Sequence, residues 1–251
     1  MSKARQLADN GAATPNRNMV INGAMNVSQR ATSVTGIGAS TAVVYQTVDR
    51  IAVAPNTAGR LTMTQTADGP SGFANCMKLD CTTADTSIAT AEYLLLQHKI
   101  EGQNLQRLKK GTSDAEQFTI SFYVKGNASA TYALSLLDND NNRSVSKLFA
   151  VTTAWNRIEM TFPADTSGAF GDDNGAGLTL DFFLHGGATY TGGTLATAWA
   201  TTNNANRAVG ISSFFDATSR TFFMTGLQLE VGSSATPFEH KTFAQDLKEC
   251  Q

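Results

Sequence analysis

The three histidines are the residues of this sequence best suited to act as general bases or metal ligands. His98, His185 and His240 lie far apart along the chain, and none of them adjoins a nucleophile motif. The sequence contains no G-x-S-x-G elbow, no phosphate-binding G-x-x-x-x-G-K-S/T loop and no H-E-x-x-H motif. We interpret the three as ordinary histidines at strand ends, and we expect no metal site, no cofactor and no enzymatic activity.

Two acidic clusters could supply the pair of carboxyl groups that glycoside cleavage needs. They are DNDNN at Asp138–Asn142 and DDNG at residues 172–175. Asp and Asn in such polar segments commonly hydrogen-bond their own backbone, so turns explain both clusters without catalysis. The first cluster also offers oxygen ligands at alternate positions, as a calcium site would, but it lacks the glycine and terminal glutamate of an EF-hand loop. A hairpin turn and a calcium site are both open for it, and the turn is favoured.

The cysteines give no sign of a disulfide framework. Cys76 and Cys81 are five residues apart in NCMKLDC, which on an extended strand places them on opposite faces. No Cys-x-x-Cys pair and no zinc-binding spacing occurs in the sequence. We expect these two and Cys250 to be reduced thiols, with the first two serving as small core residues.

A long polar segment, TLATAWATTNNANRA, contains the residues best suited to recognise a sugar. Its Trp199 could stack on a sugar ring, with Tyr190 nearby in the sequence and Asn203 and Asn204 available for hydroxyl groups. We predict these four residues as a glycan-binding site. The alternative is that Trp199 tucks inward and pins its own loop. Trp155 lies in an alternating segment, and we expect it in the core.

Charge and hydropathy exclude two classes of partner. The 251 residues include 19 Lys and Arg against 21 Asp and Glu, for a net charge of −2. Nucleic-acid binding depends on clustered basic residues, which this balance does not favour. No apolar run reaches the roughly 18 residues of a membrane span, and no charged-then-apolar leader opens the chain. We expect neither nucleic-acid binding nor membrane insertion.

The elements that would position these residues are strands. The chain has 32 Thr and 18 Ser, few charged residues and many Gly, Asn and Asp turns, a composition typical of an all-β protein. Alternating apolar residues predict strands within residues 19–27, 44–55, 59–67, 74–82, 118–126, 131–140, 145–152, 155–163, 178–187 and 220–232. Residues 91–102 could form a buried strand or a short helix. This pattern predicts a sandwich, jelly roll or barrel.

The two ends of the chain differ from the strand region. Residues 1–18 are predicted to be an arm, either disordered or ordered on a partner, with Lys3, Arg5 and Leu7 as candidate attachment residues. Residues 19–241 are assigned to the sandwich. Residues 242–251 are predicted to form a helix that Thr242 caps and that docks on the sandwich, with Phe243 on its inward face.

Several stretches follow one another in an order that is characteristic of one family. They are NRNMVINGAMNVSQRAT with its Asn22-Gly23 turn, VDRI at residues 48–51, LLQHKIEG, FTISFYVKG, the strand that begins at Trp155, and the close TGLQLEVGSSATPFEHKTFAQDLKECQ. Over residues 16–251 they resemble the jelly-roll domains of bacteriophage tail-fibre and related virion-surface proteins, which are similar in fold to carbohydrate-binding modules. The family's sequence continues through an Arg-Tyr pair where this chain ends. The resemblance implies an all-β jelly-roll sandwich with a short N-terminal arm and a short C-terminal helix.

The resemblance also implies a function. A tail-fibre or receptor-binding protein of a phage virion would recognise host cell-surface glycan through its sandwich loops. The alternative is a capsid decoration or head-fibre protein with a structural role in assembly, and the lack of a heptad repeat weakens the long-fibre version. A glycan-degrading depolymerase is disfavoured because neither an acid pair nor a β-helix repeat is found. The expected partners are other tail or capsid proteins, host polysaccharide and two further copies in a homotrimer, and the expected localisation is the virion.

Overall fold

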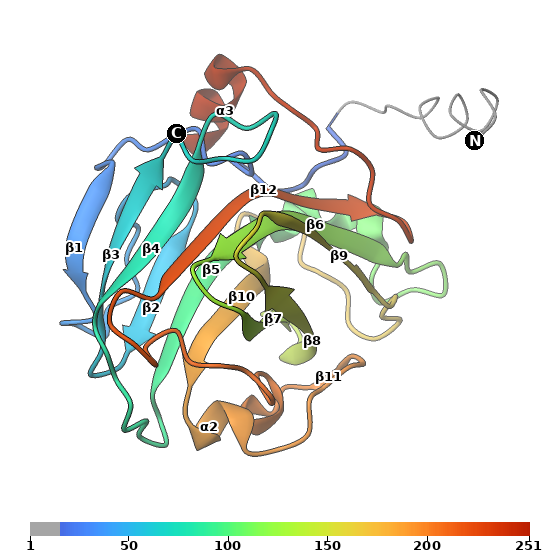
Figure 1. Ribbon diagram of the computed structural model, residues 1–251. Helices are drawn as coiled ribbons and strands as arrows, with labels where there is room; N and C mark the ends of the chain where they lie inside the picture. Colours follow the sequence, from blue (N-terminus) through green and yellow to red (C-terminus); the bar gives the residue numbers. More distant parts are fainter. Residues whose placement is uncertain (1–15) are drawn as a thin grey trace.

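The structure is a computed structural model that describes residues 16–251, and it consists of strands with a few short helices (Figure 1). The strands are β1 (Ser33–Ile37), β2 (Ala52–Asn56), β3 (Arg60–Thr66), β4 (Cys76–Thr83), β5 (Tyr93–Glu101), β6 (Phe118–Gly126), β7 (Ala130–Asp138), β8 (Arg143–Val151), β9 (Asn156–Phe162), β10 (Ala176–Gly186), β11 (Ala200–Thr201) and β12 (Thr221–Val231). The helical elements are the 3-10 turns η1 (Gly102–Asn104), η2 (Gln106–Leu108) and η3 (Asn204–Asn206) and the helices α2 (Ala188–Thr191) and α3 (Phe243–Cys250).

Two antiparallel six-stranded sheets pack face to face. Sheet A has the strand order β1-β3-β4-β12-β6-β9, and sheet B has the order β11-β8-β7-β10-β5-β2. The predicted all-β jelly-roll sandwich and its short C-terminal helix are therefore confirmed. Residues 91–102, for which two structures were open, form strand β5.

The predicted N-terminal arm falls almost wholly outside the described residues. Lys3, Arg5 and Leu7, the candidate attachment residues, lie there, so their role stays a prediction. Among residues 16–251, no helix is long and apolar enough to cross a membrane.

The alternation of apolar residues determines which face of each strand enters the core. On β6, Phe118, Ile120, Phe122 and Val124 are buried between the sheets. Phe122 packs edge-on against Phe182 of sheet B, with ring centroids 5.2 Å apart. Burying side chains of this size supplies about 1.5–3 kcal/mol each, so this interior is the main source of stability.

The turn predicted at Asn22-Gly23 forms, but the apolar residues on either side of it within residues 19–27 do not form the predicted strands. Asn22 has a φ of 57° and its buried side-chain amide donates to the carbonyl oxygens of Val27 and Asp49, each at 2.9 Å. Its side-chain oxygen accepts from the backbone N–H of Val27. The apolar residues of this segment are buried, as expected, but the Asn22 side chain replaces the ladder partners of a strand.

The C-terminal helix begins at the predicted cap and packs through a different face. The Thr242 hydroxyl accepts from the backbone N–H of Gln245, whose side chain bonds back to the backbone N–H of Thr242. Phe243, predicted to face inward, is 59% exposed, and Asp246 is the buried residue of the helix. The inward-facing prediction for Phe243 is therefore wrong.

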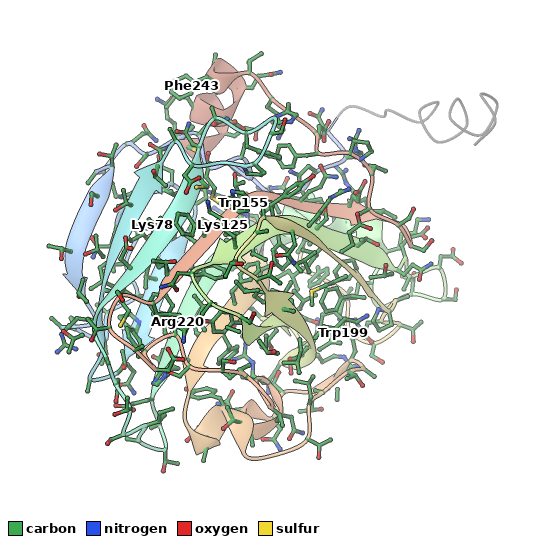
Figure 2. The ribbon with its side chains drawn as sticks, viewed as in Figure 1. Lys78, Lys125, Trp155, Trp199, Arg220 and Phe243 are labelled. Carbon is green, nitrogen blue, oxygen red and sulfur yellow. The ribbon has the colours of Figure 1, made fainter. Side chains whose placement is uncertain are left out.

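The prediction that Trp155 lies in the core is also wrong. It is half-buried outside the core cluster, where it packs edge-on against Phe223, and the Lys125 ammonium lies 5.2 Å from its ring centroid (Figure 2). The cysteine prediction holds, since Cys76, Cys81 and Cys250 are free and the first two are buried. Trp155 falls on the same face of its segment as Arg157 and Glu159, whereas Met160 and Phe162 on the other face are buried.

We predict that Gly23→Ala lowers the free energy of unfolding by about 1–3 kcal/mol, as overpacking does. A Cβ atom at Gly23 would lie 2.1 Å from the backbone oxygen of Leu227, which β12 holds in place. Gly186→Ala is the matched control, because its Cβ would meet no heavy atom closer than 3.6 Å. Urea unfolding measures both variants, and equal midpoints would contradict a tight approach at Gly23.

Candidate functional site

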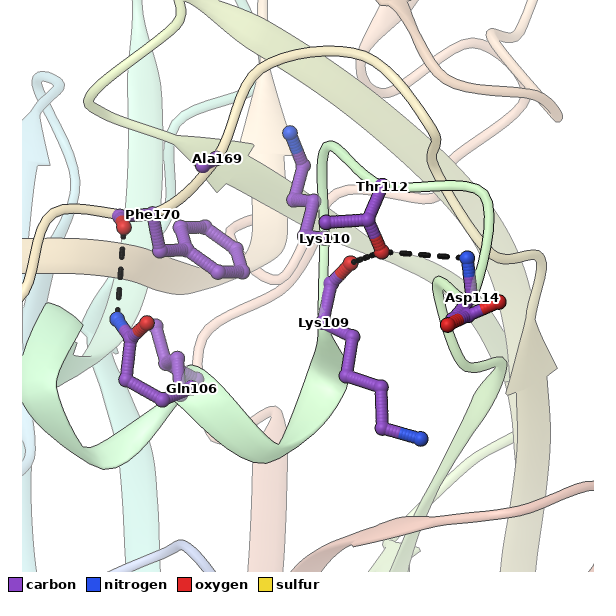
Figure 3. A pocket seen from close by; sticks show the side chains of 8 residues that line it. Gln106, Lys109, Lys110, Thr112, Asp114, Ala169 and Phe170 are labelled. Carbon is purple, nitrogen blue, oxygen red and sulfur yellow. Dashed lines mark hydrogen bonds between the residues drawn. The ribbon is translucent and has the colours of Figure 1, made fainter.

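Loops at one end of the sandwich line a cavity, which we call the main cavity. It has a volume of about 390 Å³ and lies between η2 with the turn that follows it and the loop at residues 169–170 (Figure 3). Two smaller cavities border the same region: one of about 270 Å³ includes Asn104 and Arg107, and one of about 190 Å³ includes Lys99 and Glu101. These three cavities therefore lie at the same end of the sandwich.

The main cavity combines one aromatic wall with several polar side chains. It is lined by Leu105, Gln106, Lys109, Lys110, Thr112, Asp114, Ala169 and Phe170. In Figure 3 the Phe170 ring points into the space between Gln106, Lys109 and Lys110. Lys109, Thr112 and Asp114 are exposed and offer donors and acceptors to a polar ligand. An apolar wall with a few convergent polar groups is typical of a small-ligand site.

A buried ammonium group holds the cavity's walls in place. Lys110 Nζ lies 2.6 Å from Asp138 Oδ2 and 3.2 Å from Asp165 Oδ2, and it donates to the carbonyl oxygens of Ser167 and Gly168. Arg143 adds a two-pronged pair to Asp165, at 2.7 and 3.0 Å. We call Lys110, Asp138, Arg143 and Asp165 the Lys110 network.

The Lys110 network joins loops that are far apart in the sequence. Lys110 follows η2, Asp138 and Arg143 flank the β7–β8 hairpin turn, and Asp165 follows β9. Burial would raise the pKa of Asp165, but the hydrogen bonds from Arg143, Ser167 and Lys110 together lower it below its ordinary value. The carboxylate is therefore ionised at neutral pH, as the pairing with two cations requires.

The segment at residues 138–142, which contributes Asp138 to the Lys110 network, is the first of the two acidic clusters. It forms the hairpin turn that was favoured, with the backbone N–H groups of Asp140 and Asn141 bonded to Asp138 Oδ1. The other oxygen of Asp138 pairs with the ammonium of Lys110. In the second acidic cluster, Asp173 accepts from the N–H of Gly175, the local backbone bond expected of a turn.

Trp199 lies beside this site with its ring turned partly inward. Its Nε1 donates to the carbonyl oxygen of Pro163 at 2.9 Å, and its half-buried ring packs against the core. Lys110 Nζ lies 5.7 Å from the Trp199 ring and 5.2 Å from the Phe170 ring. Lys110 therefore lies between the Trp199 ring and the cavity wall at Phe170. The hydrogen bond to Pro163 fixes the Trp199 loop in place, as the inward-tucked alternative expected. A glycan contact by Trp199 stays a prediction.

The other predicted sugar-binding residues lie away from Trp199. Tyr190 packs against Tyr93 and Phe183 on the outer face of sheet B, in a separate apolar cluster. Asn203 and Asn204 are exposed, and the Asn203 side chain caps η3 by accepting from the N–H of Ala205. The structure therefore does not bring the two aromatic residues onto one platform, and the roles of Tyr190, Asn203 and Asn204 remain untested.

Sequence reasoning missed the residues that form the cavity. Phe170 and Thr112 stand in loops without a motif, and Lys110 is one of two adjacent lysines that the sequence does not distinguish. A usable signal was the polar run of residues 102–117 between two strongly apolar strands, which marks a long connection.

The three histidines do not form a cluster. His98 is buried in β5, where burial, with a smaller contribution from nearby Arg50, lowers its pKa to about 4. His240 is exposed near the C-terminus. His185 is buried at the end of β10, at the opposite end of the sandwich from the cavity, and lies beside two carboxylates.

Comparison with known proteins finds solved structures with a similar sandwich architecture. No model of a known protein family matches the sequence, and no curated protein matches it. A structure described as CBM4 is 12% identical, with a TM-score of 0.42, and the match covers 85% of this chain and 99% of that one. A carbohydrate-binding module, TmCBM61, in complex with β-1,4-galactotriose is 10% identical, with a TM-score of 0.41 and coverage of 86% and 100%.

A phage protein is among the similar structures. The enzymatically active domain of tailspike protein 4 from bacteriophage CBA120 is 13% identical with a TM-score of 0.45. The match covers 87% of this chain but only 22% of the tailspike chain. At these identities the similarities describe the sandwich architecture alone.

We predict that Lys110→Met lowers the free energy of unfolding by about 3–5 kcal/mol, the cost of removing one partner from a buried ion pair. The substitution leaves the carboxylates of Asp138 and Asp165 buried without their shared ammonium. Lys109→Met is the matched control, because this neighbouring lysine is exposed and pairs only with Glu116 at the surface. Chemical unfolding measures both, and similar losses in the two variants would contradict the assigned role of Lys110.

Proposed function

We propose that this chain is a glycan-recognition module of a phage virion, of the tail-fibre or receptor-binding type, and that the main cavity holds the glycan. The observation that supports this most directly is the group of exposed polar side chains, Lys109, Thr112 and Asp114, that lines the cavity beside the largely buried Phe170 ring. A sugar presents hydroxyl groups that both donate and accept hydrogen bonds, which such side chains can satisfy.

The proposal is compatible with the stiffness of the site. Binding to mobile loops loses affinity because the loops must be ordered when the ligand arrives. The loops around this cavity are already tied by the buried pairs of Lys110 with Asp138 and Asp165. A glycan therefore meets a site that is formed in advance.

The virion assignment rests on the sequence resemblance described above. Host surface polysaccharide is the ligand proposed on that basis, and tail or capsid proteins and a homotrimeric assembly are the proposed partners. A capsid decoration or head-fibre role is the alternative, in which the same sandwich serves assembly and its loops carry no glycan.

We predict that Lys109→Ala and Asp114→Ala each weaken glycan binding at least tenfold. A lost hydrogen bond to a charged group costs about 1.5–3 kcal/mol, and 1.4 kcal/mol corresponds to a factor of ten. The measurement is an array of bacterial surface polysaccharides probed with the full chain, followed by titration of whichever polysaccharide binds. Lys248→Ala, an exposed lysine on α3, is the control and should bind normally.

The other outcomes of this experiment are equally informative. Binding that survives both cavity variants but is lost in Trp199→Ala would reject the cavity and place the site at the Trp199 loop. Absence of binding by a folded, oligomeric protein would contradict glycan recognition and favour the assembly role.

A further inference from the structure

The buried end of β10 carries a polar group without a hydrogen-bond partner. His185 is fully buried, and its Nδ1 lies 2.8 Å from the Ser213 hydroxyl. Its Nε2 has no hydrogen-bond partner and lies 3.8 Å from Glu92 Oε2, which is too long for a hydrogen bond. An unpartnered buried nitrogen costs free energy unless another group satisfies it.

Two carboxylates face that nitrogen. Ligand atoms of Asp85, Glu92 and His185 all lie within 4.8 Å of one another. Asp85 is 5% exposed, and the side chain of Glu92 is 14% exposed. Within residues 16–251, no lysine or arginine forms an ion pair with either carboxylate, and both lie beside the imidazole of His185.

We infer that Asp85, Glu92 and His185 form a binding site for a divalent transition-metal ion of the zinc type. Imidazole and carboxylate ligands together suit such ions, and three protein ligands leave one position for water. Ligands about 2.0–2.2 Å from zinc at tetrahedral angles are roughly 3.3–3.6 Å apart, so the 3.8 Å gap between His185 and Glu92 closes with a small movement.

The surroundings orient the three ligands as metal sites require. Ser213 fixes the His185 ring through Nδ1, which directs Nε2 at the carboxylates. The Asp85 carboxylate accepts hydrogen bonds from the Thr57 hydroxyl at 2.7 Å and from the Ala58 N–H at 3.0 Å. Glu92 Oε2 accepts from the N–H of Ala89 at 2.6 Å. Each ligand is therefore held by a second group before the ion binds.

The protonation states agree with this geometry. Burial lowers the pKa of His185 below its ordinary value, although Asp85 and Glu92 oppose that effect, so the ring is neutral at pH 7. Burial would raise the pKa of Asp85, but its hydrogen bonds and His185 lower it, so the carboxylate is ionised. A neutral imidazole and ionised carboxylates are the forms that bind metals.

The bound ion would cross-link the two sheets. Asp85 follows β4 of sheet A, whereas Glu92 precedes β5 and His185 lies in β10, both of sheet B. The site is at the opposite end of β5 from the cavity, so this inference does not depend on glycan binding. Its predicted consequence is a metal-dependent gain in thermal stability.

The test is a titration of the chelator-treated full chain with ZnCl₂, followed by calorimetry and thermal unfolding. We expect one Zn²⁺ per chain and a rise in Tm of about 5 °C at saturating metal, which EDTA reverses. Co²⁺ should give the visible d–d absorption of a tetrahedral site, a readout that does not depend on stability.

Variants identify the ligands. Glu92→Gln should weaken Zn²⁺ binding at least tenfold, and because Glu92 is at the edge of the site this variant tests the inference even if His185→Gln does not fold. His240→Gln, which changes an exposed histidine, should bind Zn²⁺ normally. Failure of the folded wild-type chain to bind Zn²⁺, or binding that is unchanged in Glu92→Gln, would overturn the inference.

Discussion

The pairing of the Lys110 ammonium with two buried carboxylates is the interaction on which the arrangement of the loops depends. Strand ladders hold each sheet together and the apolar core holds the two sheets face to face, but ladders do not reach the connections at the sandwich end. There, a single cation at 2.6 Å from Asp138 and 3.2 Å from Asp165 ties three separate connections to one point. A buried cation can hold this position because it pairs with two carboxylates and its remaining donors reach backbone carbonyls.

The two ends of β5 then carry different chemistry on one scaffold. At its C-terminal end, the tied loops leave a cavity with an aromatic wall and polar side chains, suited to a neutral or weakly charged polar ligand. At its N-terminal end, Asp85, Glu92 and His185 converge. The rigid sandwich separates these regions, so a change in one need not disturb the other.

The sequence predicted the strands well where alternation was regular. FTISFYVKG forms β6 over the same residues, and the Thr242 cap begins α3 as expected. Alternation failed at residues 19–27, because the Asn22 side chain makes bonds that mimic strand partners, a tertiary effect that a pattern cannot show. The inward positions predicted for Trp155 and Phe243 were also wrong, because the exposure of a side chain depends on which neighbouring segments cover it.

The candidate site was largely hidden from the sequence. Trp199 was predicted to stack on a sugar, a role that stays a prediction, and the residues it lies beside, Lys110 and Phe170, come from segments 89 and 29 positions earlier in the chain. Likewise, His185 meets Glu92 because β10 pairs with β5 in this register, whereas Asp85 comes from the connection that follows β4 of the other sheet. Contacts between distant segments follow from topology, which no local motif in this chain encodes.

Hydrogen–deuterium exchange on wild-type protein and Lys110→Met tests the central claim most directly. The account predicts faster exchange in the variant at residues 139–142 and 165–171 and at the Trp199 loop, with the central strands β5 and β10 unchanged. Equal exchange at these loops in the two proteins, or a uniform increase across both sheets, would show that Lys110 does not hold this end of the sandwich together.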